Sequence, residues 1–311
     1  MKFTSRREFL KILGIAGAGT LTGLSTFAFQ NGGIRQLTIL HTNDVHSRLD
    51  PYPDNDPNYP GMGGFARRAT VIRKHRTVDP ELLLVDAGDI LQGTPYFNMF
   101  GGKPEFKLMS KMKYDASAFG NHEFDNGLEG FLEILPYAEF PFLVANYDFS
   151  QTILKGKTRS YKVLVKNGIK IGLYGLGIDP EGLVSRNLYG DTKYLDPLEK
   201  ARETEEILKN QYDCELVICL SHLGYRFSSE RISDVVVARN TSHTDIILGG
   251  HTHHLLEPPA VEKNRQNLPV YIGQAGYGGV HLGKMEVTLH ENTREKFVES
   301  NTIKIHESQE V

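Results

Sequence analysis

Short apolar runs alternate with segments of helical periodicity along most of the chain, and this alternation limits the folds that the chain can adopt. Such runs are typical of strands that are buried on both faces of a sheet. They occupy residues 36–40, 81–86, 115–119, 141–146, 215–220 and 245–250.

The segments between the runs predict helices over residues 63–76, 104–112 and 196–210. In the last of these, Asp196 is the expected N-cap and Pro197 the first helical residue. Residues 161–177 predict a hairpin with Asn167-Gly168 as its turn. Residues 270–276 and 281–289 are expected to close the chain as antiparallel strands. Together the elements predict an α/β fold of two packed β-sheets flanked by helices.

Residues 1–29 differ from the rest of the chain in composition. A stretch with two adjacent arginines, Ser5 to Lys11, precedes a Gly- and Ala-rich apolar run that ends at Phe29. This pattern predicts a twin-arginine export signal ahead of one domain over residues 30–311. The alternative is a membrane anchor, but four glycines interrupt the run and it is short for a span. We therefore expect a periplasmic location, or an inner-membrane tether if the segment is not removed.

Charge and cysteine content disfavour several classes of protein. The formal net charge is −3, and without residues 1–29 it becomes −6, from 31 basic and 37 acidic residues. An acidic chain without a basic block is not expected to bind polymeric nucleic acid. Cys214 and Cys219 lie five residues apart in an apolar run, which predicts buried free thiols on opposite faces of a strand.

Polar residues follow five of the apolar runs at the points where the predicted strands end. The five stretches read HTNDVH, DAGDILQG, GNHEFD, SHLG and GGHTHH. One such stretch alone is more typical of a turn or of a capped core histidine. Because ligands of open α/β sheets bind beyond the carboxyl ends of the strands, the five together predict a single site.

The donor groups in these stretches are imidazoles, carboxylates and one amide, without a thiolate. This set suits divalent Mn, Fe, Zn or Co. One ion that keeps an open position rarely uses so many donors, whereas two ions sharing one carboxylate use all of them. Ions about 3.5–4 Å apart are typical of enzymes that hydrolyse phosphate esters. The seven candidate ligands are Asp44, His46, Asp89, Asn121, His222, His251 and His253.

The chain resembles the calcineurin-like metallophosphoesterases, and within them the bacterial 5′-nucleotidase group. The motifs that carry the resemblance are ILHTNDVHSRL, DAGDILQGTP, GNHEFDNG, ANYDF and GGHTH, in that order. It extends from about Leu37 to about Leu289. It implies a four-layer sandwich in which two mixed β-sheets lie between layers of helices.

The resemblance also implies roles for individual residues. One ion would be held by Asp44, His46, Asp89 and His253, and the other by Asp89, Asn121, His222 and His251, with Asp89 bridging. His122 and Asp125 correspond to a catalytic dyad, in which His122 stabilises charge on the phosphate or the leaving oxygen and Asp125 orients the imidazole. The expected nucleophile is hydroxide bound to the metals. Glu123 is expected to support the site.

Two features depart from the family pattern. Ser47 stands where a glycine is usual, and we expect little effect because serine is also small. Members that hydrolyse nucleotides carry a C-terminal nucleotide-binding domain, which we expect to be absent here. Either the chain acts alone on small phosphoesters, or a separate protein resembling that domain completes the pocket.

The resemblance thus predicts a phosphomonoesterase that acts on nucleotides. A cyclic-nucleotide phosphodiesterase, a nucleotide-sugar pyrophosphatase and a thiosulfohydrolase would use related centres and remain alternatives. A metal- or phosphate-binding module without activity is a further alternative, which the intact pair His122 and Asp125 disfavours.

Overall fold

A computed structural model of the protein describes residues 33–229, 231–291, 293 and 295–307. The predicted export segment, residues 1–29, lies outside these residues. Among the helices that are described, none combines the length and the apolar character needed to cross a lipid bilayer.

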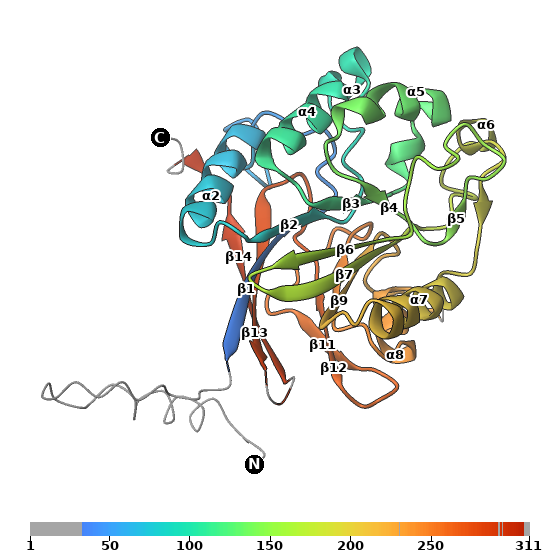
Figure 1. Cartoon of the computed structure of the whole chain (residues 1–311). Coiled ribbons are helices and arrows are strands. Elements are labelled where there is room, and N and C mark those ends of the chain that lie inside the picture. Colours follow the sequence, from blue (N-terminus) through green and yellow to red (C-terminus); the bar gives the residue numbers. More distant parts are fainter. Residues whose placement is uncertain (1–32, 230, 292, 294, 308–311) are drawn as a thin grey trace, which may run out of the picture. The chain divides into compact units, whose positions relative to one another are not determined.

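The first β-sheet contains six strands in the order β14-β13-β1-β2-β3-β4 (Figure 1). β1 pairs in parallel with β2, and β2, β3 and β4 continue in parallel, whereas β13 and β14 are antiparallel to their neighbours. The strands are β1 (Ile34–Thr42), β2 (Leu83–Asp86), β3 (Ala116–Ala118), β4 (Phe142–Leu143), β13 (His281–His290) and β14 (Lys296–Lys304).

The second β-sheet has the order β11-β12-β10-β9-β7-β6 and is parallel from β12 to β7. Its strands are β6 (Tyr161–Lys166), β7 (Ile169–Leu176), β9 (Leu216–Ser221), β10 (Ile246–Gly249), β11 (Ala260–Lys263) and β12 (Pro269–Gly273). β6 and β7 form the predicted hairpin, and both turn residues, Asn167 and Gly168, have positive φ as a type I′ turn requires. A short pair, β5 (Tyr147–Asp148) and β8 (Lys193–Tyr194), lies apart from both sheets.

Helices cover the outer faces of the two sheets, with α2, α4 and α5 over the first and α7 and α8 over the second (Figure 1). Asp196 caps α7 as predicted, because its carboxylate accepts hydrogen bonds from the main-chain N–H groups of Leu198 (2.8 Å) and Glu199 (2.9 Å). The α-helices are α2 (Phe65–Val78), α3 (Pro95–Phe100), α4 (Lys103–Met112), α5 (Gly127–Ile134), α6 (Arg186–Tyr189), α7 (Pro197–Glu206) and α8 (Asp234–Asn240). Short 3₁₀ segments are η1 (His122–Phe124) and η2 (Leu135–Tyr137), and a π-helical turn, η3 (Ile207–Gln211), extends α7.

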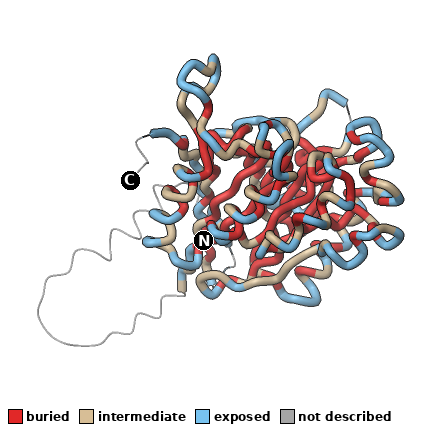
Figure 2. Tube along the Cα trace, turned by 90° about the horizontal axis from the view of Figure 1, so that it is seen from above, coloured by how far each residue is buried: buried red, intermediate tan, exposed pale blue. Residues whose placement is uncertain are grey.

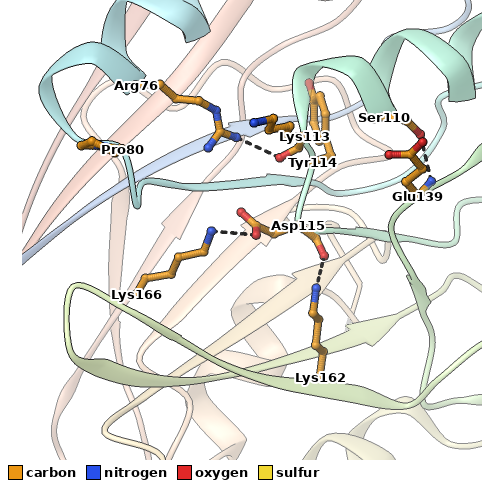
Figure 3. A pocket seen from close by; sticks show the side chains of 9 residues that line it. All are labelled: Arg76, Pro80, Ser110, Lys113, Tyr114, Asp115, Glu139, Lys162 and Lys166. Carbon is orange, nitrogen blue, oxygen red and sulfur yellow. Dashed lines mark hydrogen bonds and ion pairs between the residues drawn. The ribbon is translucent and has the colours of Figure 1, made fainter.

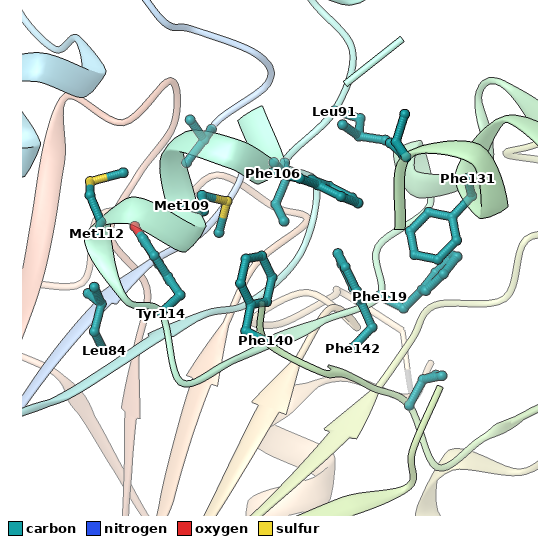
Figure 4. Close-up of a cluster of buried hydrophobic side chains, with 14 of the residues drawn as sticks. Leu84, Leu91, Phe106, Met109, Met112, Tyr114, Phe119, Phe131, Phe140 and Phe142 are labelled. Atoms are coloured by element: carbon teal, nitrogen blue, oxygen red, sulfur yellow. The ribbon is translucent and has the colours of Figure 1, made fainter. Parts of the chain in front are cut away.

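Three separate clusters of buried side chains account for the four layers. Along β2, Leu83 and Val85 face the cluster between the two sheets, whereas Leu84 faces the cluster beneath the helices, because successive side chains of a strand point to opposite faces. The helix-covered cluster of the first sheet contains Phe106 and Phe142 (Figure 4). A third cluster lies between the second sheet and its helices. Strands β2, β3, β9 and β10 are therefore buried along their whole length, which explains their continuous apolar runs. Buried residues fill the interior of the molecule in Figure 2.

The structure confirms the predicted α/β class and its two mixed sheets, and it corrects several details. β12 and β13 belong to different sheets, and β12 is parallel to β10. The thiols are buried and free, but Cys214 and Cys219 face the same cluster because Cys214 precedes β9 and does not follow its alternation. Sequence analysis missed the last strand, β14, and the helices α3, α5, α6 and α8.

Candidate metal centre

The carboxyl ends of strands from both sheets deliver the predicted ligand side chains to one place. The segment after β1 is tied to the segment after β2, because the N–H of Asp44 donates to the carbonyl of Gly88 (2.9 Å) and that of His46 to the carbonyl of Asp89 (3.1 Å). The segment after β10 joins them, since the N–H of His251 donates to both carboxylate oxygens of Asp44 at 3.0 Å. These cross-links follow from parallel strands that end at a common edge.

Asp44, His46 and His253 form the first group of donor atoms. Nε2 of His253 lies 3.3 Å from Oδ1 of Asp44 and 3.3 Å from Nε2 of His46. Asp44 and His46 are buried, and His253 is exposed at the edge of the site. One ligand atom from each lies within 4.8 Å of the others, a spacing that a single cation can span.

Asp89, His222 and His251 form the second group, and Asn121 adjoins it. Oδ2 of Asp89 lies 3.0 Å from Nε2 of His222, and Oδ1 of Asn121 lies 3.0 Å from Nδ1 of His251. The same Oδ2 of Asp89 is 3.9 Å from Nε2 of His46, which belongs to the first group. Asp89 thus lies between the two groups, where a bridging carboxylate would be placed.

The orientation of the imidazoles fits bound cations. Nδ1 of His222 contacts the carbonyl of Ala87 at 2.7 Å, so in the neutral ring Nδ1 carries the hydrogen and the Nε2 lone pair faces Asp89. Two acceptors at 3.0 Å repel unless a proton or a cation lies between them. Burial lowers the pKa of His222, but the charge and hydrogen bond of Asp89 outweigh it and raise the pKa to about 10. The position between His222 and Asp89 therefore favours positive charge, whereas burial lowers the pKa of His46 and of His251. The nitrogen and oxygen donors of the site suit the divalent ions considered above.

His122 and Asp125 form a hydrogen-bonded pair beside these groups. Nδ1 of His122 lies 2.8 Å from Oδ2 of Asp125, and the main-chain N–H of His122 donates to Oδ1 of Asp89 at 2.9 Å. Burial lowers the pKa of His122, but the hydrogen bond to Asp125 and the charge of Asp89 outweigh burial and raise the pKa to about 8. The imidazole side chain is 30% exposed. The second ring nitrogen, Nε2, is therefore available to a bound molecule.

Glu123 connects the segment after β2 to the segment after β3. Its buried carboxylate accepts hydrogen bonds from the main-chain N–H groups of Gly120 (2.7 Å), Asp89 (3.0 Å) and Ile90 (2.9 Å). Burial, followed by the charge of Asp89, raises the pKa of Glu123 to about 7. Glu123 therefore supports the site by fixing the main chain at Asp89.

Three residues around the site were missed in sequence analysis. Asn43 donates to Oδ2 of Asp44 (2.6 Å) and accepts from the N–H of Ala275 (2.7 Å). Gln274 donates to the carbonyl of Gly250 and accepts from Thr252, and so braces the segment after β10. The ring of Tyr277 packs against His253 and His46, with centroids 4.6 and 5.1 Å away. Apart from the bond between the neighbours Asn43 and Asp44, each contact joins different segments of the chain, so no local pattern reveals it.

Two packed sheets with a cluster of candidate metal ligands beyond the carboxyl ends of their strands are typical of metal-dependent hydrolases. Residues 37–255 match the family described as calcineurin-like phosphoesterase. The chain belongs to this family, and the predicted resemblance is confirmed.

Several relatives are 5′-nucleotidases. The chain is 36% identical to snake venom 5′-nucleotidase from Crotalus adamanteus over 83% of this chain and 46% of the relative, and 32% identical to human 5′-nucleotidase over 89% and 50%. Among solved structures, the 5′-nucleotidase precursor from Thermus thermophilus is 32% identical, with a TM-score of 0.78 over 87% of this chain and 54% of that one. The chain thus spans about half the length of these nucleotidases.

Proposed function

We propose that the protein is a binuclear metal-dependent phosphomonoesterase that acts on nucleotides. The observation that carries the proposal is the position of Asp89, which contacts donor groups on both sides. The 5′-nucleotidase relatives support nucleotides as the substrate class. In this proposal Asp44, His46, Asp89 and His253 hold one ion, and Asp89, Asn121, His222 and His251 hold the other.

Divalent cations at such a site neutralise phosphate charge and lower the pKa of water, which makes a nucleophile available near neutral pH. The protein's own residues complete the chemistry. Asp125 fixes Nδ1 of His122 as a donor, so Nε2 faces the substrate. The hydrogen bond to Asp125 favours the protonated form of His122, which can donate a hydrogen bond to the phosphate or a proton to the leaving oxygen.

The test is hydrolysis by the purified, metal-loaded chain. With Mn²⁺ we expect turnover of p-nitrophenyl phosphate and of AMP, and loss of both after chelation. Parallel assays with cyclic AMP, a nucleotide sugar and a thiosulfate ester separate the alternative hydrolases. Folded protein without metal-stimulated hydrolysis of any of these esters would favour a binding module and refute the proposal.

We further propose that substrate selectivity depends on a domain beyond the matched region, either in the same polypeptide or in a separate protein. The support is the length of the nucleotidase relatives, about half of which has no counterpart in the match. The chain alone should then turn over AMP more slowly than a full-length relative does. Equal rates would rule this out.

The location of the protein is also a proposal. The adjacent arginines Arg6 and Arg7 support export by the twin-arginine route to the periplasm, with an inner-membrane tether if the segment stays attached. Replacement of both arginines by lysine should leave the protein in the cytoplasm of a twin-arginine-competent bacterium. Unchanged export of that variant would contradict the assignment.

A further inference from the structure

A second candidate site lies at the opposite end of the first sheet from the metal centre. A cavity of about 730 Å³ opens there, where Pro80 precedes β2 and Asp115 precedes β3 (Figure 3). The metal-centre residues follow the same strands, so β2 and β3 separate the two sites. The volume falls within the range of about 300–1,000 Å³ that is usual for small-molecule sites.

Four cationic side chains converge on this cavity against two carboxylates. Lys162 and Lys166 reach up from β6 toward Asp115, while Arg76 and Lys113 come from the ends of α2 and α4 (Figure 3). The carboxylate of Asp115 is already engaged, by Lys166 at 2.8 Å and by the N–H of Leu84 at 2.9 Å. With Glu139 as the other acid, the lining keeps a surplus of two positive charges in a chain whose net charge is −3.

Protein groups accept only some of the hydrogen bonds that these cations can donate. Lys162 donates to the carbonyl of Asp115 at 2.7 Å. Its pKa is nevertheless lowered, first by burial and then by the charges of Lys166 and Arg159, although the charge of Asp115 raises it. Nε of Arg76 is buried without a hydrogen-bond partner among the described residues. Its Nη2 donates to the carbonyl of Lys113 at 2.8 Å, which holds the guanidinium beside the cavity.

Lys113 has a backbone conformation that is usual for glycine at the end of a helix. It ends α4 with φ of 62°, the left-handed conformation in which glycine or asparagine is usual. A lysine there has a conformational cost that glycine would not have. Residues held in such conformations are concentrated at functional sites. Lys113 thus places a cation at a position where the backbone conformation favours glycine.

We propose that this cavity binds a small anion carrying a phosphate group, at a site separate from the metal centre. A phosphate or phosphomonoester dianion matches the surplus of two positive charges. The guanidinium of Arg76 and the ammonium groups of Lys113 and Lys162 are the donors suited to it. The inference does not depend on the proposed hydrolase activity.

The test measures anion binding to the metal-loaded protein by equilibrium dialysis at fixed ionic strength. The probes are inorganic phosphate and a non-hydrolysable nucleoside phosphonate, and the tighter of the two identifies the source of the phosphate group. Any binding at the metal centre contributes equally in all variants. Lys113→Gly and Lys162→Gln should each weaken one class of sites by about tenfold, which is the loss of one charge-assisted contact.

The matched control is Lys111→Gln, which removes the same charge from the exposed last turn of α4 outside the cavity. Its phosphate binding should match that of the wild type. Lys113→Gly should also raise the melting temperature. Weaker phosphate binding in this variant could then not be explained by unfolding. Unchanged binding in Lys113→Gly, or equal weakening in Lys111→Gln, would overturn the proposal.

Discussion

The carboxylate of Glu123 allows a direct test of how the metal centre is supported. It accepts three main-chain hydrogen bonds, two at Oε2 and one at Oε1. In Glu123→Gln the amide oxygen can accept two of them, and the amide NH₂ then faces the third N–H. A buried N–H without an acceptor costs about 1–3 kcal/mol. We therefore expect the free energy of unfolding to fall by about 2 kcal/mol in urea denaturation.

Because Asp89 is mounted on the main chain that Glu123 holds, a second effect is expected. Loss of a residue that orients a metal ligand typically lowers metal affinity or turnover by about 10–100-fold. Metal affinity is measured by competition with a chelator, and turnover with p-nitrophenyl phosphate.

Glu205 provides a matched control within the same chain. Its buried carboxylate accepts from the main-chain N–H groups of Ser242 (2.7 Å), His243 (2.9 Å) and Thr244 (2.8 Å), with no contact to a candidate ligand. Glu205→Gln should therefore lose a similar stability while it keeps metal affinity and turnover. If both variants kept metal affinity, Glu123 would have no role in the site beyond folding. If Glu123→Gln were as stable as wild type, the hydrogen-bond argument would be wrong.

Three further predictions concern other parts of the molecule. His122→Ala should lower turnover by about 10²–10⁴-fold while elemental analysis finds the metal content unchanged, and loss of metal would contradict its assigned role. Burial lowers the pKa of His41 from 6.5 to about 4. Between these two pH values the unfolded chain binds a proton that the folded chain does not. The free energy of unfolding therefore falls as the pH decreases through this range, by up to about 3 kcal/mol. His41→Gln should flatten this part of a denaturation profile, and an unchanged slope would refute the explanation. In Gly175→Ala the added Cβ would overlap the main-chain oxygen of Leu143, where the two sheets approach closely. We expect the free energy of unfolding to fall by about 1–3 kcal/mol, measured by thermal denaturation. An unchanged melting temperature would show that the backbone can adjust.

Some of the architecture follows from local signals in the sequence. The Asn167-Gly168 turn and the Asp196 cap depend on residues within four positions of one another, so the sequence alone predicts them. The meeting of the candidate ligands also follows from a simple rule, because each comes just after an apolar run and parallel strands end at a common edge.

Other features depend on contacts between distant segments and were not predictable from local pattern. Asn43 reaches Ala275 and thereby fixes Asp44, although the two segments are more than 200 residues apart. β14 is an edge strand that alternates between exposed and half-buried residues, so it lacks the apolar run that identified the central strands. α5 has Gly130 in its interior, where glycine ordinarily weakens a helix, and the burial of Phe131 and Ile134 against the first sheet stabilises the helix instead.

The backbone of the candidate ligands shows why function and local preference diverge at this site. Five of the seven have positive φ, between 48° and 70°: Asp44, His46, Asp89, His251 and His253. For a residue other than glycine this conformation costs about 1–2 kcal/mol, so the five together carry a strain comparable to the whole stability of a typical domain. Glycine would relieve the strain but would remove the donor atoms. Hydrogen bonds from Asp44 to Gly88, from His46 to Asp89 and from Asp89 to Glu123 hold the strained segments in place. The strained backbone brings the candidate donors together, and the buried layers on both sides of each sheet supply the stability that offsets the strain.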